Sequence, residues 1–143
     1  MVSQPRFLWD SGARYLSEFG DDVRWLYRFK TLSDAGVVIA ASSDAPVSAP
    51  SPLTSMYAAV TRLAATGEVI GGDERLTAKQ ALEMHTRNAA YAACIEGEVG
   101  TIVPGKRADL AVLSDDPIST ATEDLPDVEV TMTITNGKVV WQR

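Results

Sequence analysis

Apolar residues follow helical spacing in the larger first part of the chain and strand-like alternation near its end. Residues 37–41, VVIAA, form a continuous apolar run rich in β-branched residues, which is typical of a strand buried on both faces of a parallel sheet. Residues 2–8 predict a short strand followed by a loop. We therefore expect strands and helices to alternate in the first part, as they do in α/β proteins.

Capping signals predict three helices. Residues 21–35 predict a helix whose first turn carries acids, which the helix dipole favours, and whose apolar face includes Trp25 and Phe29. Ser51 followed by Pro52 predicts the start of the second helix, which Gly67 would end.

The third predicted helix begins at a capping box made by Thr77 and Gln80. His85 falls in the middle of its apolar face.

The pattern becomes entirely β after Gly97. Residues 101–103 and 110–113 predict two short strands. Apolar and polar residues then alternate over residues 128–135, and Asn136–Gly137 predicts a hairpin into the last strand. This change of pattern indicates two structural units.

Composition narrows the functional classes. With 143 residues, 45% of them hydrophobic, the chain can bury a core. Its net charge of −6 and scattered basic residues argue against nucleic acid and anionic membrane surfaces as partners. No apolar run is long enough to span a membrane, and the first residues lack the pattern of a signal peptide, so we expect a cytoplasmic protein.

Asp44 is the leading candidate for chemistry. It follows the predicted buried strand, and active sites of parallel α/β folds are built at the carboxyl ends of the strands. The alternative is that Asp44 only caps the turn that precedes Pro46, because aspartate is a common turn residue. Both interpretations stay open on the pattern alone.

The chain has one histidine, His85, and one cysteine, Cys94. A catalytic zinc site usually takes three protein ligands, mostly histidine, so these residues cannot build a self-contained histidine-rich site. We expect His85 to pack in its helix rather than to bind metal. We expect Cys94 to be an idle thiol rather than a nucleophile.

Several segments, in this order, resemble the type-3 branch of the amidohydrolase superfamily. They are VSQPRFL at 2–8, LSDAGVVIAASSDAPV at 32–47, AVTR at 59–62, LTAKQALEMHTRNAAYA at 76–92, GTIVPGKRADLAVL at 100–113 and TITNGKVVW at 133–141. The resemblance implies an α/β fold, with the last βα units of a (β/α)8 metal-dependent hydrolase barrel in residues 1–96 and strands of a small β-sandwich in residues 97–143.

The resemblance also implies hydrolysis of a non-peptide carbon–nitrogen bond in a small amide-like substrate by metal-activated water. In the family, an aspartate after the last barrel strand binds the metal and transfers the proton of the metal-bound water. By resemblance this residue is Asp44, as both catalytic residue and metal ligand, and zinc is the expected metal of the complete enzyme.

The sequence departs from the family because the histidine ligands of the earlier barrel strands have no counterpart here. We therefore expect this chain alone to bind no metal tightly and to self-associate or pair with a missing N-terminal half. The alternatives are a non-catalytic truncated fragment, one half of a split enzyme, and an unrelated binding module that shares the pattern. Unpaired strand edges and apolar faces would favour association in the first two cases.

Overall fold

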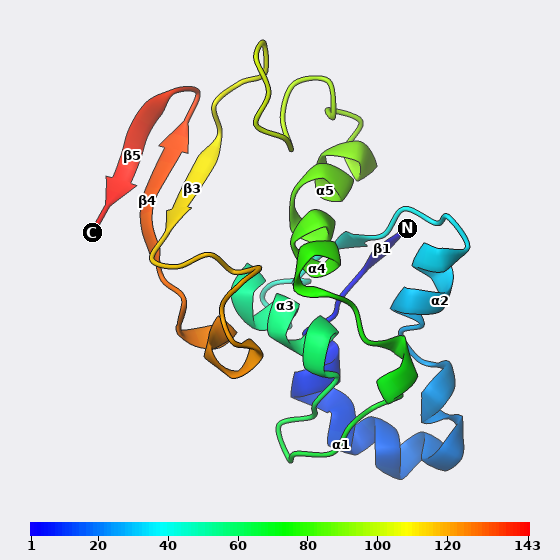
Figure 1. Cartoon of the computed structure of the whole chain (residues 1–143). Coiled ribbons are helices and arrows are strands. Elements are labelled where there is room, and N and C mark those ends of the chain that lie inside the picture. The colour runs from blue at the N-terminus through cyan, green and yellow to red at the C-terminus, as the bar shows by residue number, and fades with distance from the viewer.

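The computed structural model describes residues 1–143 and is a mixed α/β structure (Figure 1). Helices surround a two-stranded parallel sheet in the first part, and a three-stranded antiparallel sheet forms the end of the chain. Strand β1 (Val2–Ser3) pairs with β2 (Ala40–Ala41), and Val2 lies opposite Ala40. The predicted parallel strand is confirmed, although it is shorter than the apolar run.

Helix α1 (Phe7–Phe19) replaces the loop that the sequence predicted after the first strand. Its buried residues are Leu8, Gly12 and Tyr15, which recur at the spacing of one helical face. Gly12 permits close packing, because a Cβ built there would lie 2.7 Å from Cβ of Ala64. The prediction missed this helix because a small glycine stands at the centre of its buried face.

The predicted helix over residues 21–35 is wrong as a single element. The structure has the 3-10 helix η1 (Gly20–Trp25), an extended Leu26, and then α2 (Phe29–Asp34). Phe29 is fully buried, but Trp25 is 56% exposed, so the predicted shared face of these two residues does not exist. The break has a tertiary cause, which is the side chain of Arg62.

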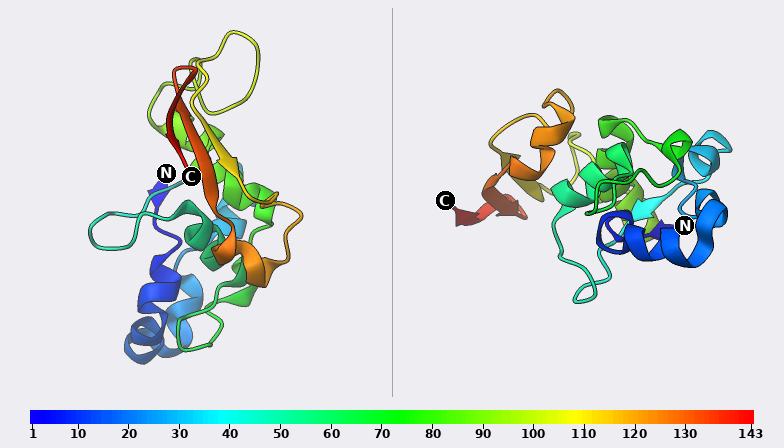
Figure 2. Two further views of the ribbon diagram at one scale, coloured as in Figure 1. Left: turned by 90° about the vertical axis from the view of Figure 1, so that its left-hand side faces the viewer. Right: turned by 90° about the horizontal axis from the view of Figure 1, so that it is seen from below.

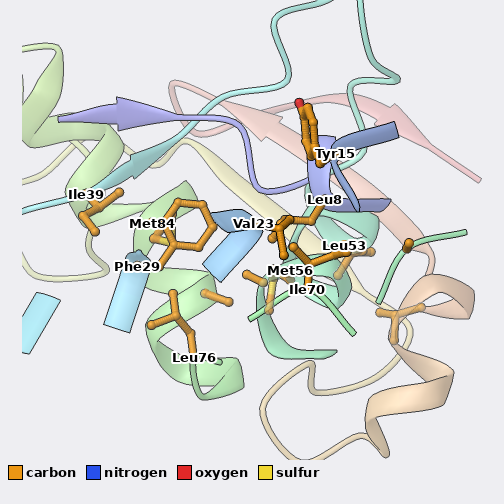
Figure 3. Packing of buried hydrophobic residues seen from close by; sticks show 14 residues of the cluster. Leu8, Tyr15, Val23, Phe29, Ile39, Leu53, Met56, Ile70, Leu76 and Met84 are labelled. Carbon is orange, nitrogen blue, oxygen red and sulfur yellow. The ribbon is translucent and has the colours of Figure 1, made fainter. Parts of the chain in front are cut away.

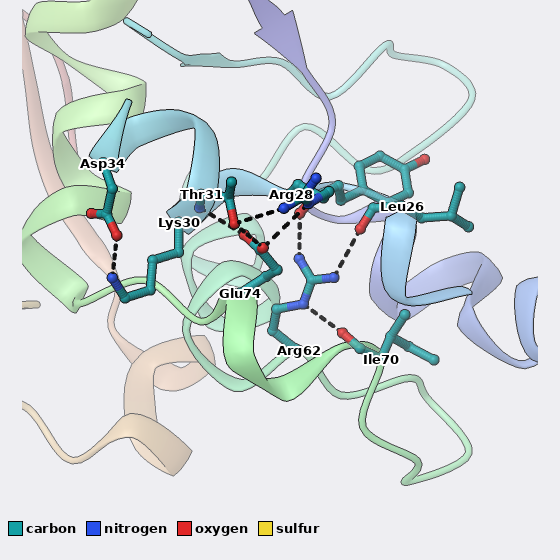
Figure 4. Close-up of polar contacts among 9 residues, drawn as sticks. Leu26, Arg28, Lys30, Thr31, Asp34, Arg62, Ile70 and Glu74 are labelled. Carbon is teal, nitrogen blue, oxygen red and sulfur yellow. Dashed lines mark hydrogen bonds and ion pairs between the residues drawn. The ribbon is translucent and has the colours of Figure 1, made fainter. Parts of the chain in front are cut away.

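The guanidinium of Arg62 is buried among three backbone carbonyl oxygens (Figure 4). It donates to Ile70 at 2.5 Å, to Tyr27 at 2.6 Å and to Leu26 at 3.1 Å. The backbone that these bonds hold is not helical, because Leu26 is extended and Tyr27 is left-handed, with φ 52°. Nearby, Glu74 of the 3-10 helix η2 (Gly72–Glu74) accepts from the backbone amide of Thr31 at 2.8 Å.

Helix α3 (Pro52–Thr61) begins as the sequence predicted. The side chain of Ser51 accepts a hydrogen bond from the amide of Thr54. The helix ends earlier than predicted, because Arg62 adopts a left-handed conformation with φ 59°. Gly67 instead lies in the following turn, where its φ of 97° suits glycine.

The capping box of Thr77 and Gln80 at the start of α4 (Ala78–His85) is confirmed. The predicted third helix is interrupted at Thr86, and α5 (Arg87–Ala92) follows. His85 is therefore the last residue of α4 rather than a mid-helix residue. The side-chain amide of Asn88 donates to the carbonyl oxygen of Ile39 at 3.0 Å, which joins α5 to the segment before β2.

Strands β3 (Leu110–Leu113), β4 (Val130–Thr135) and β5 (Lys138–Gln142) form the antiparallel sheet, in the order β3-β4-β5. The predicted hairpin at Asn136–Gly137 is confirmed. The predicted strand at residues 101–103 is wrong, because this segment is a loop stabilised by Lys106. The ammonium of Lys106 donates to Thr101 Oγ1 at 2.7 Å and to the carbonyl oxygens of Glu96 and Val99.

One apolar core holds the first part together (Figure 3). Phe29, Leu8, Met56 and Ile70 are its most buried large apolar side chains. Val128, beside the 3-10 helix η3 (Thr122–Asp127), joins the same core and so anchors the chain just before β4. No helix has the length and apolar character required to cross a membrane.

Candidate functional site

Asp44 lies just beyond the carboxyl end of β2, as the sequence predicted. Its backbone is left-handed, with φ 54°, a conformation that aspartate tolerates better than most residues. Figure 2 shows that the loop between β2 and α3 projects from the body of the molecule. The Asp44 side chain is exposed at the start of this loop.

Two serine hydroxyls, and not the carboxylate of Asp44, accept hydrogen bonds from the backbone amides of the turn. Ser42 Oγ accepts from the amide of Asp44 at 3.2 Å, and Ser43 Oγ accepts from the amide of Ala45 at 3.3 Å. The carboxylate of Asp44 makes no hydrogen bond or ion pair in the structure. The turn-capping alternative therefore applies to the serines, and the carboxylate is free for another role.

A pocket of about 360 Å³ adjoins this turn. Its lining contains one cationic side chain and five further polar ones: Arg6, Ser42, Ser43, Ser51, Ser55 and His85. The pocket lies where the carboxyl end of β2, the first turn of α3 and the last turn of α4 meet. The elements that carry Asp44 therefore also enclose a polar pocket.

Arg6 is held in place by one residue of α1 and one of α3. Its Nε donates to Asp10 of α1 at 3.2 Å, and its Nη1 donates to the hydroxyl of Thr54 in α3. Asp10 in turn accepts from the hydroxyl of Ser48 at 2.8 Å. This network connects α1, the projecting loop and α3 around the pocket.

His85 is largely withdrawn from water, and burial lowers the pKa of its imidazole from 6.5 to about 4. The ring is therefore neutral at neutral pH. Its Nε2 atom is buried and has no hydrogen-bond partner. Packing at the end of α4 agrees with the predicted role of this residue, but the unpartnered nitrogen was not foreseen.

Ser55 and Arg6 are polar members of this pocket that sequence reasoning missed. Ser55 is 3% exposed, and its hydroxyl is also buried without a partner. The available signal was a serine among the buried residues of an otherwise apolar helix face, between Leu53 and Met56. Arg6 follows the buried Pro5 and gave no signal of its own.

The residues of this chain do not fit a complete metal centre. No three histidine, cysteine, aspartate or glutamate side chains come together in a way that could hold a metal ion. Cys94 is exposed beyond the end of α5. Asp44 can offer one carboxylate oxygen ligand, and a catalytic zinc ion usually takes three protein ligands.

The chain belongs to the amidohydrolase family, whose sequence profile matches residues 4–141. It is 38% identical, over 118 residues, to N-substituted formamide deformylase of Arthrobacter pascens, which covers 82% of this chain and 22% of that protein. It is 37% identical, over 115 residues, to imidazolonepropionase of Chloroflexus aggregans, covering 78% of this chain and 24% of that protein.

A solved structure of an uncharacterised metal-dependent hydrolase from Pyrococcus horikoshii OT3 superposes with a TM-score of 0.73 and 28% sequence identity. The similarity covers 85% of this chain and 25% of that one. The chain thus spans about a quarter of the length of the relatives it matches. Its family and its metal-dependent hydrolase neighbours agree with the resemblance seen in the sequence.

Proposed function

We propose that this chain supplies the last βα units of a metal-dependent amidohydrolase barrel, in residues 1–96, and strands of the accompanying β-sandwich, in residues 97–143. The observation that carries the proposal is a free carboxylate, Asp44, just beyond the carboxyl end of a parallel strand. This edge is where catalytic residues gather in (β/α)8 barrels.

Asp44 has two proposed roles, as one ligand of a divalent metal and as the group that transfers a proton during hydrolysis. A bound divalent metal, zinc by family resemblance, supplies an acidified water. A carboxylate beside it can hold that proton and deliver it to the departing nitrogen. Support comes from the hydroxyls of Ser42 and Ser43, which satisfy the turn and leave the Asp44 carboxylate unengaged.

The proposed substrates contain a non-peptide carbon–nitrogen bond in a small molecule. The name of the Arthrobacter pascens relative points to N-substituted formamides, and its 38% identity makes this class the first to assay. The family membership supports the wider class of amides and cyclic amides.

The histidine ligands of the proposed metal must come from residues other than these 143, because His85 is the only histidine present. We propose that a further polypeptide segment packs against this chain. Support comes from exposed apolar side chains beside β2 and on the last strand: Val37, Val38, Val139, Val140 and Trp141. Both edges of the β1-β2 sheet also lack a third strand, and open edges favour pairing.

To test the proposal, the chain is purified under native conditions together with any polypeptide or metal that stays bound to it. Mass in solution gives the assembly, elemental analysis gives metal per chain, and formate release from a simple N-alkylformamide gives activity. In an active assembly, Asp44→Asn removes hydrolysis while Asp115→Asn, a change at an exposed carboxylate of the C-terminal part, leaves it intact.

Full activity of the Asp44→Asn assembly would refute the assignment of Asp44. An assembly that contains neither metal nor hydrolytic activity would favour the second candidate, a non-catalytic protein of the same family. The absence of any three-residue metal-binding group within the chain is the observation that favours this candidate.

A further inference from the structure

Two residues that line the pocket beside the Ser42–Ser43 turn each carry a buried polar atom without a hydrogen-bond partner. They are Ser55, through its hydroxyl, and His85, through Nε2. Buried polar atoms in native proteins nearly always have a hydrogen-bond partner. Because these two are the only such atoms in the structure and share one pocket, a single bound group could satisfy both.

Ser55 provides the stronger observation of the two. It is 3% exposed, and it lies in the first turns of α3 on the face that packs into the core. A serine in a helix can bond a carbonyl oxygen of the preceding turn, as Thr61 does with Tyr57 at 2.8 Å. Ser55 makes no such bond, so its hydroxyl stays available to the pocket.

The polar lining of the pocket suits an anion. Arg6 is the one charged residue in the lining, and the only carboxylate paired with it is Asp10, at 3.2 Å, which is not a lining residue. Asp10 and Thr54 engage Nε and Nη1 of Arg6, which leaves Nη2 without a partner. Ser51 and Ser55 belong to the amino-terminal end of the ten-residue α3, and the dipole of a helix favours negative charge there.

The hydroxyl groups supply matching donors. The Oγ atoms of Ser42 and Ser43 accept hydrogen bonds from backbone amides, so their hydroxyl hydrogens remain free to donate. The neutral ring of His85 can present its Nε2 as a donor in one of its two tautomers. Donors from the turn after β2, from α3 and from α4 therefore line a space of about 360 Å³, which is ample for a small oxyanion.

We propose that this pocket binds a small oxyanion, the carboxylate or phosphate group of a small molecule, through Arg6, Ser55 and His85. The proposal stands on the pocket alone. It requires neither the metal nor the carboxylate of Asp44, so it can fail or hold independently of the proposed hydrolysis.

The single histidine makes a direct test possible. Its ring C–H signals in NMR report on this pocket without assignment of other residues. The 143-residue chain is titrated at about pH 7.5, where the ring is neutral, with sodium acetate, sodium phosphate or sodium chloride at one ionic strength. We expect a saturable shift with acetate or phosphate and none with chloride. Tighter binding of one oxyanion identifies the class of ligand.

Variants connect the shift to the proposed contacts. Ser55→Ala and Arg6→Gln should each weaken oxyanion binding by about ten-fold, the loss expected for one charge-assisted or buried hydrogen bond. Ser17→Ala, a change at an exposed serine of α1, should leave binding unchanged. Thermal unfolding of each variant verifies that the fold persists.

The proposal is overturned if neither oxyanion gives a saturable shift, or if chloride gives the same shift. It is also overturned if folded Ser55→Ala binds as tightly as the wild type. In that last case the shift would come from an adventitious surface contact of the ion.

Discussion

Arg62 Nη1 donates to the carbonyl oxygen of Tyr27, 35 residues earlier in the chain, at 2.6 Å. This contact joins the end of α3 to the break between η1 and α2. The guanidinium carbon lies 5.8 Å from the ring centroid of Phe29, so Arg62 also makes a cation–π contact with this ring. Burial lowers the pKa of Arg62 to about 10, and the side chain therefore stays charged at neutral pH.

Arg62→Met should destabilise the fold by at least about 2 kcal/mol, because the carbonyl oxygens of Leu26 and Ile70 lose their donor and that of Tyr27 keeps only the amide of Phe29. Urea unfolding followed by circular dichroism measures the loss. Arg14→Met, at an exposed position of α1, serves as the control and should change stability by less than about 0.5 kcal/mol. Equal stability of the two variants would contradict the structural role of Arg62.

Thr77→Ala should cost about 1 kcal/mol, because the capping box at the start of α4 loses the side chain that accepts the amide of Gln80. The midpoint of thermal unfolding reports this change. Lys79→Ala, an exposed substitution in the same helix, should be close to neutral. If Lys79→Ala lost as much stability as Thr77→Ala, the proposed stabilisation by the capping box would be wrong.

Gly12→Ala should destabilise the chain by about 1–3 kcal/mol, since the added Cβ would lie 2.7 Å from Cβ of Ala64 and α1 would have to move. Gly97→Ala is the matched control, because a Cβ there has no atom within 4 Å. Denaturant titration of both variants should separate them clearly. Wild-type stability of Gly12→Ala would mean that α1 packs less closely than the structure indicates.

Acidification should destabilise the fold through His85. Its folded pKa of about 4 lies below the unfolded value of 6.5, so the unfolded chain takes up the proton first. The contribution to stability is complete above pH 6.5 and is lost as the pH falls toward 4. Between about pH 7.5 and pH 5, the loss should be about 2 kcal/mol.

His85→Phe keeps an aromatic ring and removes the titrating group, so its stability should vary less over the same pH interval. The carboxyl groups of Glu68, Glu74 and Asp109 have lowered pKa values and act at lower pH, equally in both proteins. Unfolding free energies at the two pH values give the comparison. Parallel pH profiles would show that His85 does not control acid stability.

Local chemistry accounts for the elements that were predicted correctly. Ser51 and the box of Thr77 and Gln80 bond amides three residues away, and Asn136–Gly137 defines its hairpin within two residues. Sequence neighbours contain all the partners of these interactions, so pattern reasoning could identify them. The division into residues 1–96 and 97–143 remains a prediction.

The errors arose where a distant residue decides the backbone. Arg62 bonds the carbonyl oxygens of Leu26 and Tyr27 and so stabilises the non-helical backbone that breaks the predicted helix over residues 21–35. Lys106 bonds the loop around Thr101 and prevents the predicted strand there. Neither side chain reveals from the sequence which backbone groups it will reach.

The same distinction applies to the candidate site. The sequence by itself determined the family, the position of Asp44 after a buried parallel strand and the scarcity of metal ligands, because motif order, strand pattern and residue counts are properties of the linear chain. Only the tertiary structure decided that the serines, and not Asp44, hold the turn. It alone brought Arg6, Ser55 and His85 to one pocket, because they come from the residue before α1, from α3 and from α4, whose packing depends on the whole core.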